Sequence, residues 1–280
     1  MGTPVSLQKP KDTFLEINGL RLRCLDWRTG DKPPVLMLHG LAVFAHAWDH
    51  NAAALSDALD IVALDQRGHG ASDRGPCEDY RTETYAADIV GVCDALGWSR
   101  CSLVGQSMGG HNSMYAAAIH PDRVERLVIS DMEPTMRLDL IAYMRDADSL
   151  PEYASIEEVI ADAHARNPRP DAVLERQRAE HTVRRLPNGR LTPMYDLLAP
   201  KCWQALDLWP YLRRITCPTL LVRGAESPVL RSDVAREMVA TIPNCTFVEI
   251  PGAGHSIGLD NPAAFDAAVR EFLTAAPRGA

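Results

Sequence analysis

Short apolar segments recur along this chain, and most of them are separated by segments long enough to form a helix. The candidate buried strands are residues 34–40, 60–65, 101–106, 126–131, 218–224 and 246–250. Between two of them, Tyr85, Ile89 and Val92 recur at helical spacing. Buried strands that alternate with helices predict an α/β fold, with a mostly parallel sheet covered by helices on both faces.

Two segments depart from this alternation. Residues 14–27 form two alternating stretches around an Asn-Gly pair, which predicts an antiparallel hairpin. Residues 134–212 contain charged helical segments without an obvious strand pattern. We therefore predict a core built from residues 1–133 and 213–280, with a helical cap of residues 134–212 inserted after one strand of the sheet.

The charge, hydropathy and cysteine content of the chain indicate which partners it can bind and in which cellular compartment we expect it. The net charge of −8 is spread along the chain without a block of like charge, which argues against a nucleic-acid partner. No apolar run approaches the roughly 20 residues needed to cross a bilayer, so we expect no membrane association. Residues 1–14 lack the apolar region of a secretory signal, and the seven cysteines form no CxxC pair. We expect a protein of the reducing cytoplasm.

A candidate nucleophile, Ser107, lies in the segment CSLVGQSMGG, residues 101–110. It contains the pattern G-x-S-x-G, with Ser107 at its centre, between a predicted strand and a predicted helix. Glycines on both sides of a serine permit a sharp turn that lifts the hydroxyl clear of the sheet. The start of the helix adds a positive dipole end, which favours developing negative charge. A purely structural turn would have the same pattern, so the assignment depends on the partners of Ser107.

Three further motifs supply such partners. His39-Gly40 ends the first buried strand, where the N–H of Leu41 could pair with the N–H of Met108 to form an oxyanion hole. A glycine-rich turn, DQRGHGAS, follows the next strand at residues 65–72. The segment PGAGHSIG then places His255 in a loop beyond the last strand, a suitable position for a general base.

In this order, these motifs resemble the α/β-hydrolase family over nearly the whole chain. The resemblance implies the α/β-hydrolase fold, with Ser107 as nucleophile and His255 as base. It further implies that the amides of Leu41 and Met108 form the oxyanion hole. Asp65 and Arg67, in the turn typical of the family, look structural.

The resemblance leaves the acid of the triad open. Many family members carry this acid after the strand that follows the cap, but here that position is Ser227, and Glu226 lies one residue early. The other family position, at the end of the strand before the cap, holds Asp131. We favour Asp131, with Glu226 as the alternative and Glu133 as a further candidate.

This triad predicts a serine hydrolase that cleaves a small carboxylic ester or lactone through an acyl-enzyme, without a metal or an organic cofactor. His46 and His50 have the i, i+4 spacing of metal ligands but lack the glutamate of H-E-x-x-H. We expect His39 and His69, in their glycine-rich turns, to orient the backbone.

The substrate is the least constrained part of the prediction. In the cap, Tyr143, Trp203 and Trp209 are candidates for lining an apolar acyl pocket. One alternative activity is carbon–carbon bond hydrolysis of a ring-cleavage product, with a substrate carboxylate bound by Arg137, Arg184 or Arg185. A second alternative is a ligand receptor with slow turnover.

Overall fold

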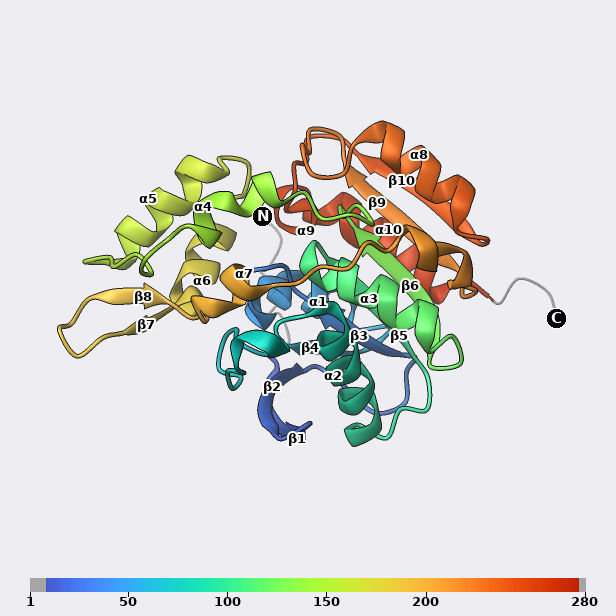
Figure 1. The fold of residues 1–280 in the computed structure, drawn as a ribbon, viewed down its shortest axis with the longest axis horizontal. Helices are drawn as coiled ribbons and strands as arrows, with labels where there is room; N and C mark the ends of the chain where they lie inside the picture. Colours follow the sequence, from blue (N-terminus) through green and yellow to red (C-terminus); the bar gives the residue numbers. More distant parts are fainter. Residues whose placement is uncertain (1–8, 277–280) are drawn as a thin grey trace, which may run out of the picture.

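The computed structural model describes residues 9–276 of the chain. Over these residues the main sheet has eight strands, in the order β1-β2-β4-β3-β5-β6-β9-β10 (Figure 1). β1 runs antiparallel to β2, and β2 antiparallel to β4, whereas the other neighbours are parallel. The prediction of a mostly parallel sheet in an α/β fold is confirmed.

Each predicted strand is present. Their bounds are β3 (Pro34–Leu38), β4 (Asp60–Leu64), β5 (Cys101–Gln106), β6 (Val124–Ser130), β9 (Thr219–Gly224) and β10 (Cys245–Ile250). The predicted hairpin is formed by β1 (Lys11–Ile17) and β2 (Leu20–Asp26). Its turn consists of Asn18 and Gly19, with φ of 50° and 79°, the left-handed geometry that two-residue hairpin turns favour.

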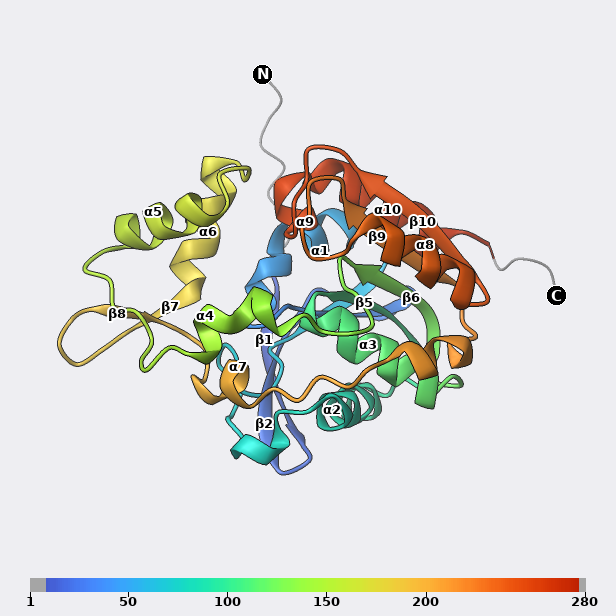
Figure 2. The same cartoon turned by 45° about the horizontal axis from the view of Figure 1, so that its top comes forward.

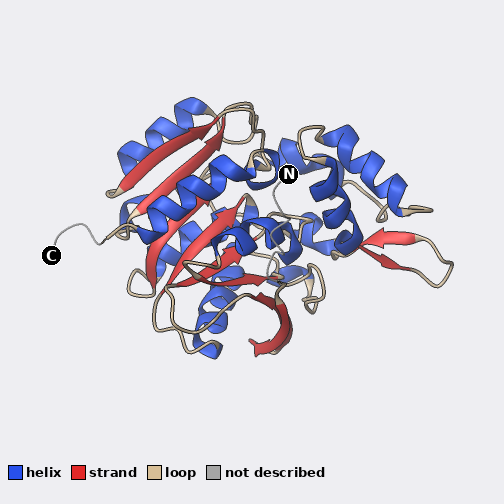
Figure 3. Ribbon diagram, turned by 180° about the vertical axis from the view of Figure 1, so that it is seen from behind, coloured by secondary structure: helices blue, strands red, loops and turns tan. Residues whose placement is uncertain are grey.

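Helices cover both faces of the sheet. Successive strand residues point to opposite sides, so the apolar strands supply side chains to a core on each face. Leu36 and Leu38 of β3 belong to the core on one face, whereas Val35 and Met37 belong to the core on the other. The first face is covered by α2 (Thr82–Ala95), α3 (Met108–Ile119) and α8 (Ser232–Thr241). The second is covered by α1 (Asp49–Leu55) and α10 (Pro262–Thr274). Figure 3 shows this layered arrangement of strands and helices.

Residues 134–212, which lie between β6 and β9 in the chain, are called the cap segment. In Figure 2 its α5, α6 and β7–β8 hairpin lie to one side of the sheet and its helices. Its elements are η3 (Leu138–Ile141), α4 (Ala142–Arg145), α5 (Ile156–Arg166), α6 (Ala172–Thr182), β7 (Val183–Arg185), β8 (Leu191–Pro193), α7 (Leu198–Cys202) and η4 (Trp209–Arg214). The last of these extends two residues beyond the cap segment.

Besides its helices, the cap segment contains the antiparallel β7–β8 pair, which the sequence does not predict. Its turn uses Gly189 at φ 84°. The two strands have three residues each, too short for an alternating pattern to stand out in the sequence.

One disulfide joins the cap segment to the core. Cys77, in η2 (Cys77–Asp79), is bonded to Cys202 at the end of α7, 125 residues later. The sequence does not predict this bond, because pairing at such a separation leaves no spacing pattern. Disulfides persist mainly in oxidising compartments, so the bond stands against the expectation of a reducing cytoplasm. Among residues 9–276, no helix is long and apolar enough to span a membrane.

Candidate active site

Ser107 lies in a strained turn between β5 and α3. Its φ of 53° and ψ of −120° form a conformation that residues with a side chain rarely adopt. A Cβ added to Gly105 would lie 2.4 Å from the carbonyl oxygen of Gly109, and a Cβ added to Gly109 would lie 2.2 Å from that of Leu38. Glycine is therefore required at both positions for the backbone to pack this closely.

His255 follows β10, in the loop before α9 (Ile257–Asp260). Its Nδ1 lies 2.7 Å from Oδ2 of Asp131, which directly follows β6 and is fully buried. Asp131 also has a positive φ of 52°. Strained backbone therefore occurs at both Ser107 and Asp131, as is common where a side chain must be aimed at a functional site.

The other two acid candidates are engaged elsewhere. Oε2 of Glu226 accepts a hydrogen bond from Nη2 of Arg169 at 2.7 Å. Oε1 of Glu133 accepts one from Nε of Arg231 at 2.9 Å. Of the three carboxylates considered from the sequence, Asp131 is thus the one that contacts the imidazole of His255.

Ser227 has a contact that the sequence analysis did not assign. Its hydroxyl donates a hydrogen bond to Oδ2 of Asp131, the oxygen that also contacts His255. The N–H of Gly224 lies 3.3 Å from Oδ1. The residue at the family's more common acid position thus holds the carboxylate of Asp131, a role that its place in the sequence could have suggested.

Gln106 is a second residue that the sequence analysis missed. Its Nε2 lies 3.1 Å from Nε2 of His255 and 3.3 Å from the His255 carbonyl oxygen. Since the amide donates, Nε2 of His255 accepts, and Nδ1 carries the proton directed at Asp131. Within residues 9–276, Ser107 makes no hydrogen bond with His255. Gln106 must therefore leave Nε2 before His255 can accept a proton from Ser107.

Two buried histidines hold the loop after β3. Nδ1 of His39 donates to the Gly40 carbonyl at 2.8 Å, and Nε2 of His69 accepts from the N–H of Ala42 at 3.1 Å. Burial lowers the pKa of His39 to about 4 and that of His69 to about 3. Both imidazoles are therefore neutral near pH 7 and can act as one donor and one acceptor, as we expected for residues that orient the backbone.

The loop held by these histidines contains the predicted oxyanion-hole residue Leu41. Neither the N–H of Leu41 nor that of Met108 donates a hydrogen bond to any residue from 9 to 276. Met108 begins α3, so its amide is one of the helix N-terminal groups that lack a partner within the helix. Both amides are thus free to bind a ligand oxygen.

A cavity of about 400 Å³ lies over Ser107, between the core and the cap segment. Its lining from the core includes Leu41, Gln106, Ser107 and His255. Its lining from the cap segment includes Tyr143, Met144, Tyr153, Arg166, Arg178, Thr182 and Tyr195. Tyr143 therefore lies where the sequence analysis expected it, although its side chain is largely exposed.

Trp203 and Trp209 do not line this cavity, contrary to the prediction. Trp203 is buried and packs edge-on against His111 of α3, with ring centroids 5.7 Å apart. Trp209 borders a separate hollow beside Glu133 and Arg231. Both tryptophans follow α7, where the chain packs on the core and no longer faces Ser107.

The arginines proposed from the sequence as carboxylate ligands also lie outside the cavity. Arg137 donates to Asp139 at 3.0 Å, and Arg185 donates to the Gly189 carbonyl at 2.7 Å. Arg184 belongs to the exposed β7 strand. Arg166 and Arg178 line the cavity instead.

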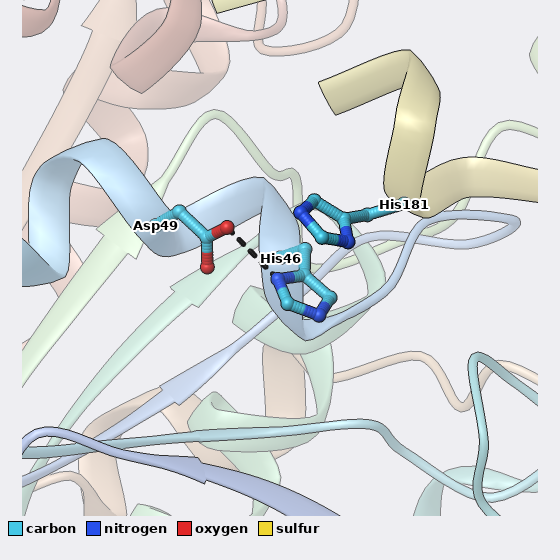
Figure 4. Close-up of side chains that lie close together, drawn as sticks. All are labelled: His46, Asp49 and His181. Carbon is cyan, nitrogen blue, oxygen red and sulfur yellow. Dashed lines mark hydrogen bonds and ion pairs between the residues drawn. The ribbon is translucent and has the colours of Figure 1, made fainter. Parts of the chain in front are cut away.

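His46 has a different partner set from the one considered in the sequence. It lies beside Asp49 and His181 of α6, not in a pair with His50, and the potential ligand atoms of these three residues are within 4.8 Å of one another (Figure 4). The two imidazoles stack with centroids 3.9 Å apart and planes inclined by 9°. Nε2 of His46 also lies 2.8 Å from Nη2 of Arg23. A metal ion would therefore require one ring to rotate, because lone pairs in parallel planes do not converge on one point.

Comparison with known proteins identifies related sequences and folds. The family described as "alpha/beta hydrolase fold" matches residues 33–262. The 2-(acetamidomethylene)succinate hydrolase of Mesorhizobium japonicum is 32% identical over 252 residues, which cover 88% of this chain and 90% of that protein. Esterase YbfF of Escherichia coli is 26% identical over 247 residues, covering 86% and 92% of the two chains.

A solved structure shows the same relationship at the level of the fold. The crystal structure of E-2-(acetamidomethylene)succinate hydrolase superimposes with a TM-score of 0.86 at 29% identity, and the match covers 95% of this chain and all of that one. The similarity thus extends over the cap segment as well as the sheet and its helices.

Proposed function

Because the chain belongs to the α/β-hydrolase family, we propose that it is a serine hydrolase that cleaves small carboxylic esters or lactones. The similar proteins named above are hydrolases, and one of them is an esterase. The observation that carries the proposal is the 2.7 Å contact between Nδ1 of His255 and the buried carboxylate of Asp131, beside the strained turn at Ser107. An imidazole held in this tautomer can accept a proton at Nε2 once Gln106 no longer donates to that atom.

The proposed cycle begins when Gln106 leaves Nε2 of His255. Oγ of Ser107 then attacks the substrate carbonyl carbon while its proton passes to Nε2 of His255. Asp131 stabilises the resulting imidazolium, and the amides of Leu41 and Met108 bind the carbonyl oxygen as it becomes negative. The imidazolium protonates the leaving alkoxide, which leaves an acyl group on Ser107.

Water completes the cycle. His255 removes a proton from a water molecule, whose oxygen attacks the acyl carbon, and the proton is returned to Ser107 as the acid product leaves. Every proton transfer uses side chains of this protein, so the proposed reaction needs no metal or organic cofactor. We propose that a small molecule occupies the cavity. The cytoplasm remains our hypothesis for the location of the protein, and the disulfide is the observation that argues against it.

Hydrolysis of a bond other than an ester is the second candidate. The Mesorhizobium japonicum relative is named for a substituted succinate, and its similarity covers most of both chains. In a carbon–carbon bond hydrolase, the same nucleophile, base and oxyanion hole would act on a carbonyl group of the substrate. A receptor with slow turnover would share the geometry but not the release of the acyl group.

Turnover counting separates these functions. Purified protein is mixed with p-nitrophenyl butyrate, with γ-butyrolactone and with a vinylogous diketone, and product is measured per mole of enzyme. The proposal expects many turnovers of the ester or the lactone, whereas a single burst of one p-nitrophenolate per chain would indicate a receptor. Turnover of the diketone alone would indicate a carbon–carbon bond hydrolase. Ser107→Ala should lose this turnover, and Ser232→Ala, at an exposed serine on α8, is its matched control.

A further inference from the structure

Arg178 projects from α6 at the junction of two cavities. It lines the cavity of about 400 Å³ that contains Ser107, and also a smaller one of about 50 Å³ bordered by Trp48 and Asn51. Gln106 and Ser256 border both cavities as well. Arg178 therefore lies in the same space as the catalytic side chains, on the side that the cap segment covers.

The spacing along α6 explains this position. The α6 residues that line the larger cavity are Glu175, Arg178, Ala179 and Thr182. They are related by steps of three and four residues, so they form one face of the helix. Arg176 lies on another face and pairs with Glu157, with Nη1 and Oε1 3.3 Å apart. Two arginines of one helix thus differ in surroundings, one at the cavity and one at the surface.

The guanidinium of Arg178 has no anionic partner. Its Nε is buried without a hydrogen bond, and no ion pair joins this side chain to any residue from 9 to 276. Burial lowers the pKa of Arg178, and the charge of Arg166 acts in the same direction. Charged hydrogen-bond donors removed from water are normally paired, because leaving them unpaired costs free energy.

Glu175 and Asp260, whose charges act on the pKa of Arg178, have other partners. Glu175 lies 3.2 Å from Nδ1 of His164. Asp260 accepts hydrogen bonds from Asn167 at 2.6 Å and from the N–H of Gly254 at 2.8 Å. Both carboxylates thus already have partners, and among residues 9–276 neither forms an ion pair with Arg178.

Other arginines of the cap segment do have acceptors. Arg145 donates to the carbonyl oxygens of Pro200 and Trp203, and Arg169 donates to Glu226. Arg166, which also lines the cavity, pairs with Asp162 at 2.8 Å. Of the two arginines that line the cavity, Arg166 is thus paired with a carboxylate of the protein, whereas Arg178 is not.

We propose that Arg178 binds a carboxylate group of the substrate, so that the preferred substrate is an ester or lactone whose acyl part carries a negative charge. This inference rests on the proposed hydrolase function of the Ser107 site. A guanidinium offers parallel donors that match the two oxygens of a carboxylate. A bound carboxylate would supply the acceptor that the protein itself does not provide.

The test compares two p-nitrophenyl esters of equal acyl length, the glutarate monoester, which carries a carboxylate, and the neutral valerate ester. Arg178→Gln removes the charge, and Arg176→Gln is the matched control on the same helix. We expect Arg178→Gln to lower kcat/KM for the glutarate ester by about ten- to a hundredfold, the range for a hydrogen bond to a charged group. The loss on the valerate ester should be much smaller than that on the glutarate ester in Arg178→Gln, and Arg176→Gln should cleave both esters as the wild type does.

Equal losses for the two esters in Arg178→Gln, or the same loss in Arg176→Gln, would overturn the proposal while leaving the hydrolase function in place. Arg178→Lys keeps the charge without the planar fork, and should retain an intermediate rate on the glutarate ester. This second variant decides the matter if Arg178→Gln does not fold.

Binding of free glutarate separates failure of this proposal from failure of the hydrolase function. Glutarate should raise the melting temperature of the wild type and of Arg176→Gln, but not that of Arg178→Gln. This result would support the carboxylate site even if neither ester were cleaved. An equal rise in all three proteins would refute the site.

Discussion

Acidification should weaken the fold through its buried histidines. His39, His69 and His111 are almost completely buried, and burial lowers their pKa values to about 4, 3 and 4. In the unfolded chain a histidine has a pKa of about 6.5. Between these values the unfolded chain binds more protons than the folded one, so the free energy of unfolding is greatest above about pH 6.5 and falls as the pH decreases.

The size of this loss follows from the shifts. At pH 5 each of the three imidazoles is still mostly neutral in the folded protein but almost fully protonated in the unfolded chain. The difference of 1.5 pH units from 6.5 corresponds to about 2 kcal/mol per histidine. The three together amount to about 6 kcal/mol, which is comparable to the whole stability of a typical domain, about 5–15 kcal/mol.

Urea unfolding at pH 7, 6 and 5 measures this loss. His111→Phe is the useful variant, because the ring packs against Trp203 and a phenyl group can occupy the same space. We expect the variant to lose about 2 kcal/mol less than the wild type between pH 7 and pH 5. Equal losses of stability in the two proteins would show that His111 does not contribute to the pH dependence. A wild type as stable at pH 5 as at pH 7 would refute the effect of the buried histidines altogether.

Three further predictions concern the triad and the cavity. Asp131→Asn should lower turnover by about ten-thousand-fold through loss of the reactive tautomer, whereas Glu226→Gln should cost little, and steady-state kinetics that gave the reverse order would transfer the role of the acid. Ser227→Ala removes a donor to Asp131 and should lower kcat by about tenfold with KM unchanged, whereas a change in KM alone would contradict a role in holding the carboxylate. Tyr143→Ala should alter the preference between short and long acyl chains in an ester series, whereas Trp203→Ala should lower the melting temperature by several degrees and affect all esters equally. An effect of Trp203→Ala on chain-length preference at unchanged stability would restore that residue to the substrate site.

The centre of the sheet was predictable because β3, β4 and β5 are buried on both faces and are therefore continuous apolar segments. The hairpin was predictable because Asn18-Gly19 favours one kind of turn. The turn at Ser107 was predictable because close backbone packing at Gly105 and Gly109 excludes any side chain, which restricts the sequence there. These features depend on local chemistry or on a repeated pattern.

The missed features depend on contacts between distant parts of the chain. Nothing near Cys77 in the sequence indicates Cys202 as its partner, and nothing near Trp203 indicates that its ring packs on α3. The helical spacing that brings Arg178 to the cavity could be read from the sequence. Its lack of a partner could not, because this depends on where Glu175 and Asp260 find theirs.

The central claim is that Ser107 is the nucleophile. Its most direct test is reaction of the protein with a fluorophosphonate, followed by mass spectrometry of the peptides and by ester kinetics of Ser107→Ala. We expect one adduct, on Ser107, and a loss of about a million-fold in turnover in a folded Ser107→Ala variant. An adduct on another residue, or ester hydrolysis retained by purified Ser107→Ala, would contradict it.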